Sequence, residues 1–206
     1  DLGNVEAPDR VKPVPCLHHD VQALLTFMES NLPPRLRLHP ITGSAILFIY
    51  ADASGLGFGS SVWLQGSSTV HIEEGVWSLL YSGKSSNFRE MCNITLRLEG
   101  LVHQGVIPVG TEVFVFTDNQ VTEHAFYRGT SSSPELFELV LRMKKLEMSH
   151  NIFLRIVWVA GTRMIEQGTD GFSRGDLENG VATGRPMLSF VPLNLSPFCR
   201  SPSLEL

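Results

Sequence analysis

Hydrophobic positions from residue 45 onward first follow the spacing of strands. AILFIYAD, residues 45–52, is a short and mostly apolar run, whereas GLGFGSSVWLQG, residues 55–66, and STVHIEEG, residues 68–75, alternate apolar and polar positions. Alternation is typical of a half-exposed strand, and a short apolar run is typical of a buried one. Only short turns separate the three segments, so they are predicted to pair as an antiparallel meander.

Helical spacing begins after the meander. In SSNFREMCNITLRLEGLVHQG, residues 85–105, apolar side chains recur along one stripe, and Glu90, Asn93 and Arg97 share the opposite face. This pattern predicts an amphipathic helix that ends near a glycine. A second long helix is predicted over residues 131–148, because a serine cap and a first-turn proline precede its apolar stripe.

The remaining segments complete the order of elements. Residues 111–118 and 151–159 are apolar and are predicted as strands, with a brief helix over residues 119–127. Residues 160–175 are predicted as a loop that leads into a short helical turn. A meander followed by βαβ crossovers implies an α/β fold with a mixed five-stranded sheet, in which two parallel strands join the meander and helices cover both faces.

The length and composition suit one globular domain with tails. The chain has 206 residues, of which 43% are hydrophobic and 18% are charged. We place the domain at residues 45–175. Residues 1–44 are predicted as a connecting segment with one short helix, and residues 176–206 as a linker or tail rich in proline and serine. Because the sequence begins without an initiator methionine, we expect a piece of a longer polypeptide.

The cysteines and the absence of long apolar runs bear on the compartment. Cys16, Cys92 and Cys199 are odd in number and lack metal-ligand spacing, so free thiols in a reducing, intracellular compartment are expected. The sequence has no run of about eighteen apolar residues, so neither a membrane span nor a membrane partner is expected.

The charge balance opposes a tight electrostatic grip on nucleic acid. The formal net charge is −5 with histidines neutral, and the densest basic group, RMKK at residues 142–145, is modest. Phosphate binding depends on Lys and Arg. If nucleic acid is the substrate, the chain by itself is expected to bind it weakly.

Four acids occupy positions from which they can converge. Asp52 and Asp118 end two apolar strands, Glu90 lies early in the helix between them, and Asp170 follows the last strand. If the two strands are parallel neighbours, their acids face the crevice where open α/β sheets bind ligands. Converging carboxylates repel one another, and hard oxygen ligands suit Mg²⁺. Taken singly, each acid also fits a helix cap or a solvated position.

Four sequence blocks carry a resemblance to a known family. They are YADASGLGFGSSVW, SSNFREMCNI, VFTDNQ and VWVAGTRMIEQGTDGFSRG. They resemble the ribonuclease H domain of retroelement reverse transcriptases, and NFRE and TDGFSRG are most similar to the DIRS-like, tyrosine-recombinase retrotransposons. The resemblance implies an RNase H-like fold, an RNA–DNA hybrid as substrate, and an adjacent reverse transcriptase domain in the same polyprotein.

The resemblance also implies hydrolysis of the RNA strand by two Mg²⁺ ions, for which Mn²⁺ substitutes. The ions would lie about 3.5–4 Å apart, one activating water and the other stabilising the leaving 3′-oxygen. Asp52 would bridge both ions, Glu90 and Asp118 would hold one, and Asp170 would hold the other. Glu90 is also placed to contact a ribose 2′-hydroxyl, the group that separates RNA from DNA.

Polar and small residues near the acids are candidate substrate contacts. Ser54 and Gly55 follow Asp52, where they either let a sugar–phosphate backbone approach closely or form a tight turn. Asn119 follows the third acid and either binds a base or sugar or caps the next helix. Arg163, in the last loop, is either a substrate contact or a solvated side chain.

One position departs from the pattern of the relatives. Many of them place a histidine shortly before the glycine of the final loop, as H-x-x-G, whereas this chain has Trp158 in VWVAG. The loop from Gly161 to Asp170 is also longer than the commonest retroelement version. The departure puts proton shuttling or product release in question, and Arg163 and Glu166 are candidate substitutes.

Three functions fit these features. An active, Mg²⁺-dependent ribonuclease H is favoured because all four acids are present. The alternative is a catalytically inactive RNase H-like tether that positions nucleic acid or a partner inside the polyprotein, but such tethers usually lose acids. The third is another nuclease or an integrase of the same fold. Integrases place a glutamate on the late helix, whereas the last acid here is Asp170 in a short turn.

Overall fold

The structure is a computed structural model that describes residues 45–68 and 70–178, together with residues 21–22, 24–25 and 28–29. The chain divides into two compact units, residues 1–34 and 35–206. The described residues of the first unit are helical. Expectations for the other residues of the two termini, Cys16 and Cys199 among them, lie outside the described residues. No helix in the described part is long and apolar enough to cross a membrane.

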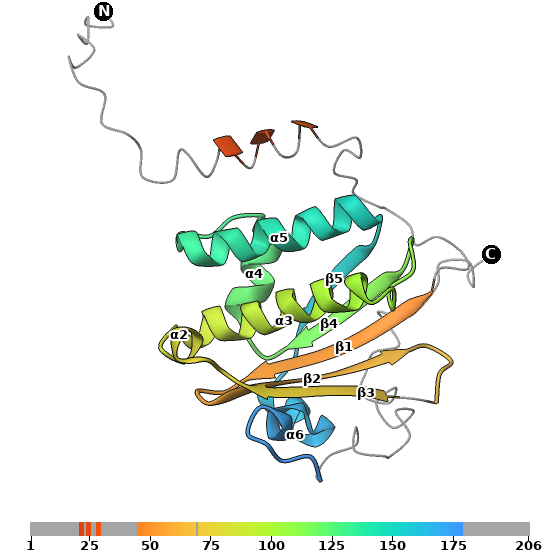
Figure 1. Cartoon of the computed structure of the whole chain (residues 1–206), viewed down its shortest axis with the longest axis vertical. Coiled ribbons are helices and arrows are strands. Elements are labelled where there is room, and N and C mark those ends of the chain that lie inside the picture. The colour runs from red at the N-terminus through yellow and green to blue at the C-terminus, as the bar shows by residue number, and fades with distance from the viewer. Residues whose placement is uncertain (1–20, 23, 26–27, 30–44, 69, 179–206) are drawn as a thin grey trace, which may run out of the picture. The chain divides into compact units, whose positions relative to one another are not determined.

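A mixed five-stranded sheet forms the centre of the second unit (Figure 1). Its strands are β1 Ile46–Ala53, β2 Gly57–Leu64, β3 Val70–Val76, β4 Glu112–Thr117 and β5 Phe153–Trp158. They lie in the order β3-β2-β1-β4-β5; β1–β2 and β2–β3 are antiparallel, whereas β1–β4 and β4–β5 are parallel. The predicted meander and its two parallel additions are confirmed, and β1 and β4 are direct neighbours.

Three helices cover one face of the sheet: α3 Ser86–His103, α4 Gln120–Arg128 and α5 Pro134–His150 (Figure 1). Their apolar stripes pack on the side chains that β1, β4 and β5 direct to this side. The core includes the whole stripe predicted on the first long helix, Met91, Ile94, Leu98 and Leu101. Because most helical stability in proteins comes from packing of an amphipathic face, burial of this stripe holds α3 in place across the sheet.

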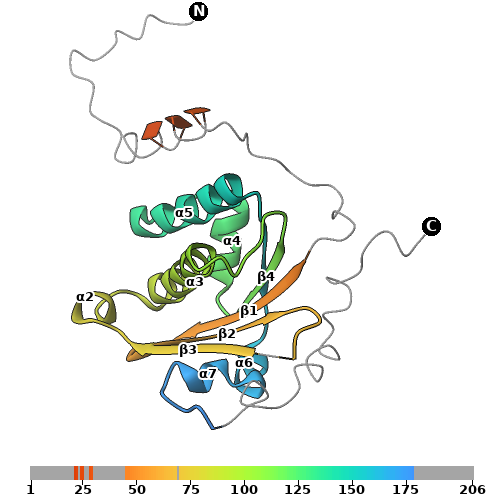
Figure 2. The same cartoon turned by 45° about the vertical axis from the view of Figure 1, so that its right-hand side comes forward.

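The opposite face carries a smaller layer made of α6 Gly161–Gln167 and α7 Thr169–Phe172 (Figures 1 and 2). An aromatic cluster from β1, β2 and β4 packs with Met164 of α6 on this side. The predicted α/β class with helices on both faces is therefore confirmed. One local prediction is wrong, because the segment of α6 was expected to be a loop. Only Met164 and Gln167 of this helix are buried, so its sequence lacks an apolar period.

Side-chain caps set where the helices of the larger layer begin. A short helix, α2 Leu79–Ser82, follows β3, and Ser85 then caps α3 by accepting the N–H of Phe88. Ser133 caps α5 in the same way, with a proline in the first turn as predicted. Each such cap satisfies a backbone donor that the helix itself cannot. Since Ser85 fixes the start of α3, the second turn of that helix lies beside the carboxyl ends of β1 and β4.

Candidate metal centre

Three of the four predicted acids meet at the carboxyl edge of the sheet. Asp52 is the penultimate residue of β1, Asp118 immediately follows β4, and Glu90 projects from the second turn of α3. One carboxylate oxygen from each residue lies within 4.8 Å of one from each of the others. The parallel pairing of β1 with β4 brings the two aspartates together, and the capped start of α3 brings the glutamate to them.

Two oxygens of this cluster are buried without hydrogen-bond donors. Asp52 is only 6% exposed. Neither its Oδ2 nor Oε2 of Glu90 has a hydrogen-bond partner among the described residues. A buried polar atom left unpaired costs about 1–3 kcal/mol, and more when it is charged. Both atoms belong to the same three-carboxylate set, so a single hard divalent cation would satisfy them together. The residues present therefore fit a metal of the Mg²⁺ class.

The ionisation of the cluster is perturbed in the direction that a cation would reverse. Burial is the main reason that the pKa of Asp52 rises to about 6; a hydrogen bond with Ser173 partly opposes the rise, and Asp118 and Asp170 add to it. Burial likewise raises the pKa of Glu90 to about 8, with further contributions from Asp118 and Asp52. The pKa of Asp118 is raised mainly by burial, and Asp170 adds to this. A bound divalent charge favours the ionised forms.

Asp170 lies near the cluster but is engaged differently. It occupies the first turn of α7 and forms an ion pair with Arg174, whose Nη1 also donates to the Asp170 carbonyl at 2.8 Å. Its charge raises the pKa of Asp52 and Asp118, so it acts on the cluster through space. Among the described residues, however, the close-set ligating group consists of the other three acids. The fourth predicted acid is thus adjacent to the cluster and already paired.

The polar face of α3 is bonded to the sheet. Asn93 is buried, and its Nδ2 donates to the carbonyl oxygens of Asp52 and Gly59 at 2.8 and 3.0 Å. Arg97, one turn later, forms an ion pair with a glutamate of β3. These contacts hold α3 over β1, β2 and β3 and so fix its acid above the site. The sequence indicated a shared polar face, but only the register of the sheet reveals its partners.

The small residues after the first acid let α7 approach the sheet. A Cβ at Gly59 would lie 2.4 Å from Cβ of Phe172 and 2.7 Å from the backbone N of Ser173, so only glycine fits there. Ser54 Oγ donates to the Ser173 carbonyl at 2.7 Å and accepts backbone N–H groups of its own turn. The turn expected around Ser54 is present. Gly55 is exposed with open space around it, and its contact with a substrate stays a prediction.

The two other candidate substrate contacts are engaged within the fold. Asn119 is buried and caps α4; its Oδ1 accepts from Thr122 at 3.1 Å and its Nδ2 donates to Asn87 at 2.9 Å. Of the two roles considered for Asn119, the structure shows the cap. Arg163 is exposed on α6 and pairs with Glu166 at 3.0 Å. Substrate binding by either residue stays a prediction.

Trp158 lies directly beside the cluster. It is the last residue of β5, is 41% exposed, and donates from its indole Nε1 to the carbonyl of Asp118 at 3.0 Å. Its backbone N–H donates to Oε1 of Glu123 at 3.3 Å. The sequence marked this position as a departure from the histidine of the relatives. The hydrogen bond to the backbone of a site acid could not be predicted, because it joins residues 40 positions apart.

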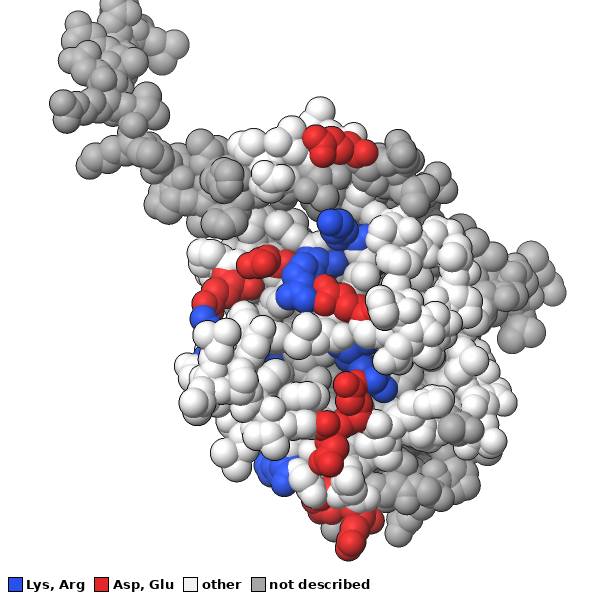
Figure 3. Space-filling model, in the orientation of Figure 1, with Lys and Arg blue, Asp and Glu red and all other residues white. Residues whose placement is uncertain are grey.

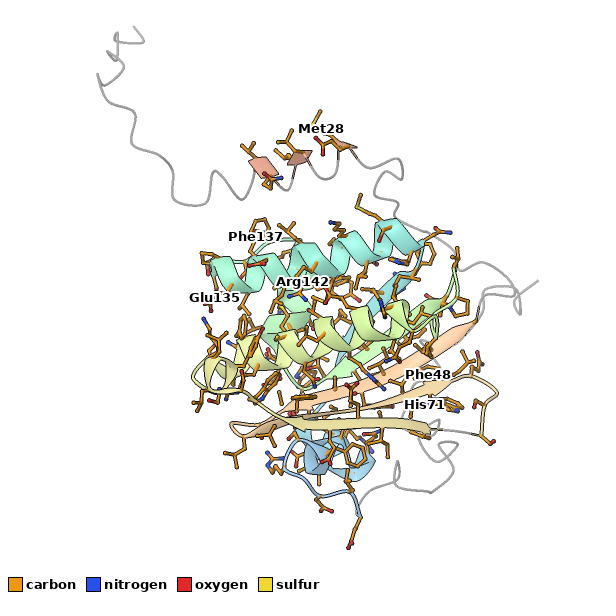
Figure 4. The ribbon with its side chains drawn as sticks, in the orientation of Figure 1. Met28, Phe48, His71, Glu135, Phe137 and Arg142 are labelled. Carbon is orange, nitrogen blue, oxygen red and sulfur yellow. The ribbon has the colours of Figure 1, made fainter. Side chains whose placement is uncertain are left out.

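Basic side chains in the described part are mostly neutralised by neighbouring acids. Seven ion pairs occupy Lys84, Arg97, Arg142, Lys144, Arg155, Arg163 and Arg174. On the face shown in Figure 3, acidic and basic groups alternate without forming a broad basic surface. Arg142, for example, extends from α5 toward α3 (Figure 4), where its Nε donates to Glu99 at 2.8 Å. This pairing is consistent with weak electrostatic attraction for phosphates.

Comparisons with known proteins agree with this fold. No protein-family model matches the sequence, and no curated protein does. Among solved structures, the N-terminal RNase H domain of a Mycobacterium tuberculosis protein, solved as a fusion with maltose-binding protein, is 21% identical with a TM-score of 0.51, over 68% of this chain and 94% of that one. RNase H1 of the halophilic archaeon Halobacterium salinarum is 14% identical with a TM-score of 0.51, over 66% of this chain and 98% of that one. The chain therefore has the RNase H-like fold.

Proposed function

We propose that this chain is a divalent-metal-dependent ribonuclease H that hydrolyses the RNA strand of RNA–DNA hybrids. The observation that carries the proposal is the cluster of Asp52, Glu90 and Asp118, which presents two buried, unpartnered carboxylate oxygens on an RNase H-like fold. Structural neighbours of the fold are named as RNase H proteins. An unpaired acid cluster of this kind is unfavourable for stability, so it is better explained by a ligand than by packing.

The chain's own residues would divide the work of holding the cofactor. Asp52, Glu90 and Asp118 would hold a first Mg²⁺ or Mn²⁺, and Asp170 would take part in holding a second after leaving its ion pair with Arg174. The bound metal would supply Lewis acidity that polarises the phosphate and lowers the pKa of the attacking water. No side chain then has to act as the nucleophile. Burial of the acids excludes bulk water from their inner oxygens.

Substrate selection would rest on groups around the cluster. Glu90 would contact a ribose 2′-hydroxyl, which DNA lacks. Ser54 and Gly55 belong to the turn beside Asp52, where the open space around Gly55 leaves room for a sugar–phosphate backbone. Asn119 and Arg163 remain proposed contacts. To bind substrate, Asn119 would have to share the amide that caps α4 and bonds Asn87, and Arg163 the guanidinium that pairs with Glu166.

The wider context rests on the sequence resemblance alone. By that resemblance we place the domain at residues 45–175 inside a DIRS-like retrotransposon polyprotein. Residues 1–44 would then lead from an adjacent reverse transcriptase domain, and residues 176–206 would lead to the next domain. The protein would work inside the cell, in a reducing compartment. Because most described cations are paired, the polymerase would supply most of the grip on the hybrid.

The test is a cleavage assay on a hybrid with a labelled RNA strand. Wild type and Asp52→Asn, purified in parallel, are incubated with Mg²⁺, with Mn²⁺ and with EDTA. Glu138→Gln, which removes an exposed carboxylate on α5, serves as the matched control. The labelled strand is also presented as single-stranded RNA and as an RNA–RNA duplex. We expect cleavage of the RNA strand in the hybrid alone, retained in the control and lost in Asp52→Asn and in EDTA.

Other outcomes would change the conclusion. Cleavage that persists in Asp52→Asn would indicate a contaminating nuclease and remove the support for this site. No cleavage by a folded wild-type protein at high concentration would favour the inactive tether. Circular dichroism of each variant shows whether it is folded.

A further inference from the structure

We propose that Trp158 is a substrate-contacting residue whose indole packs against the sugar and base of the nucleic-acid strand bound at the acid cluster. This inference rests on the proposed function, since it assumes a nucleic-acid substrate at that cluster. The motivating feature is an aromatic side chain that is 41% exposed although it ends a strand next to a site acid.

The indole is held in a defined orientation. Its Nε1–H donates to the Asp118 carbonyl at 3.0 Å, and its backbone N–H donates to Glu123 at 3.3 Å. Trp158 also pairs with Thr117, the residue before Asp118, in the parallel register of β4 and β5. One edge of the ring is therefore anchored to the site, and its polar atom is already satisfied. The exposed remainder of the ring is apolar, which suits stacking better than hydrogen bonding.

The charges around the site point to the same kind of contact. Arg174 is paired with Asp170, and Arg163 is paired with Glu166. Both cations therefore already have an acidic partner in this structure. Contacts that are not ionic are therefore expected to contribute to the affinity for a strand. Stacking of sugars and bases on aromatic rings is such a contact, and it tolerates any base sequence.

The other tryptophans make Trp158 a selective reporter. Trp63 and Trp77 are each only 7% exposed. Binding of a strand against Trp158 should change the intrinsic fluorescence of the wild type, and Trp158→Phe should lack this change. The titration uses an RNA–DNA hybrid with Ca²⁺ in place of Mg²⁺, since Ca²⁺ also binds carboxylate oxygens but at longer distances.

Kinetics separate stacking from a purely structural role. We expect Trp158→Ala to raise KM for the hybrid roughly tenfold and Trp158→Phe to raise it much less, because phenylalanine keeps an aromatic face. The KM ratio of Trp158→Ala to wild type should stay constant between about 50 and 200 mM salt, since the lost contact is not ionic. Ile165→Ala, which removes an exposed apolar side chain from α6, is the matched control and should leave KM unchanged.

Two results would overturn the proposal. One is an unchanged wild-type fluorescence on adding hybrid, together with equal KM values for all variants. The other is an equal fall in kcat for Trp158→Ala and Trp158→Phe at constant KM, which would mean that the indole acts only through its hydrogen bond to Asp118. Fluorescence quenching by hybrid without any cleavage would instead retain the stacking contact and remove the proposed hydrolase activity.

Discussion

Asp52, Glu90 and Asp118 differ from Asp170 in what surrounds each carboxylate. The three clustered acids lie on or directly after elements of the main core, and two of their oxygens are buried without partners among the described residues. Asp170 lies on a four-residue helix and is paired with Arg174. Among the described residues, the clustered acids therefore have no ion-pair partner, whereas Asp170 has one.

The two sides are also attached to the sheet differently. Asn93 bonds the clustered side directly to the backbone of β1 and β2. The α6–α7 side is attached through side chains, because Gln167 bonds to Ser61 of β2 and to Thr169. The clustered acids are thus preorganised and electrostatically unfavourable, whereas Asp170 must exchange a partner before it binds anything else. Under the proposed function, this difference implies a first metal site that is intrinsic to the fold and a weaker second one.

The largest expected effect is the difference between the cleavage rates (kcat) of the Asp52→Asn and Asp170→Asn variants. Loss of Asp52 should reduce kcat about 10²–10³-fold or more, because it removes charge from the centre of the cluster. Loss of Asp170 should reduce kcat only about 10–100-fold, as for residues that support a metal site. Single-turnover cleavage of a labelled hybrid measures both. Equal losses would mean that the two sides are equally essential, and the contrast drawn above would fail.

The next effect concerns the pH dependence of stability without metal. The folded pKa of Glu90 is about 8 and that of Asp52 is about 6, both above their unfolded values. The native state therefore binds more protons than the unfolded state between about pH 4 and pH 8, so stability is highest in acid and falls as pH rises through this window. Glu90→Gln removes the contribution of Glu90 to this decrease in stability. In EDTA at about pH 8 the variant should therefore be more stable than the wild type by about 1–3 kcal/mol.

Urea unfolding at both ends of this window, with EDTA or with Mg²⁺, measures the effect. Mg²⁺ should stabilise the wild type at the alkaline end, by about 2.7 kcal/mol at a hundredfold excess over Kd, and should stabilise Glu90→Gln much less. Asp170→Asn should keep most of the Mg²⁺ effect, since it leaves the three-acid cluster intact. A wild type that becomes more stable with rising pH in EDTA would contradict the assignment of the raised pKa values.

Much of the sheet could be predicted from the sequence, because each strand carried its own local signal. The apolar run of β1, the alternation in β2 and β3, and the turns between them specify a meander without any long-range information. Asp52 lies at the carboxyl end of β1, and Asp118 directly follows β4. Because these strands are parallel neighbours, as expected, the two acids meet at the same edge of the sheet. The stripe on α3 likewise gave the direction of its apolar face.

What could not be predicted depends on partners far along the chain. Asn93 contacts backbone 34 and 41 residues away, and the indole of Trp158 contacts backbone 40 residues away. Residue spacing along one helix cannot reveal such partners. The helix α6 was missed because it buries only Met164 and Gln167, too few for an apolar period. The ion pair between Asp170 and Arg174 was also not predicted. The sequence analysis expected all four carboxylates to bind metal and did not consider a neighbouring arginine as a partner.

A smaller effect, on the free energy of unfolding, is expected when the hydrogen bonds of Asn93 or of Gln167 to the sheet are removed. Asn93→Ala leaves two buried carbonyl oxygens without the donor they share and should cost about 2–3 kcal/mol of unfolding free energy. Gln167→Ala should cost a similar amount: the Ser61 and Thr169 hydroxyls lie 3.5 Å apart and can bond each other, but the buried backbone N–H of Thr169 loses its acceptor. Urea denaturation in EDTA compares the two. A larger loss in Gln167→Ala would show that the smaller layer, and not the polar face of α3, is the stronger attachment.

The smallest expected effect is that of Arg174→Gln. The Arg174 side chain is 55% exposed, so its pair with Asp170 should contribute at most about 1 kcal/mol to stability. Its charge nevertheless lowers the pKa of both Asp52 and Asp118. Removing it should raise both pKa values, so the acidic limb of the pH–rate profile should move to higher pH by a few tenths of a unit, as expected for a screened surface charge. Added salt should produce a similar shift in the wild type and a smaller one in the variant. An unchanged pH–rate profile would mean that Arg174 neutralises Asp170 alone. The pair of Asp170 and Arg174 would then have no influence on the ionisation of the three clustered acids.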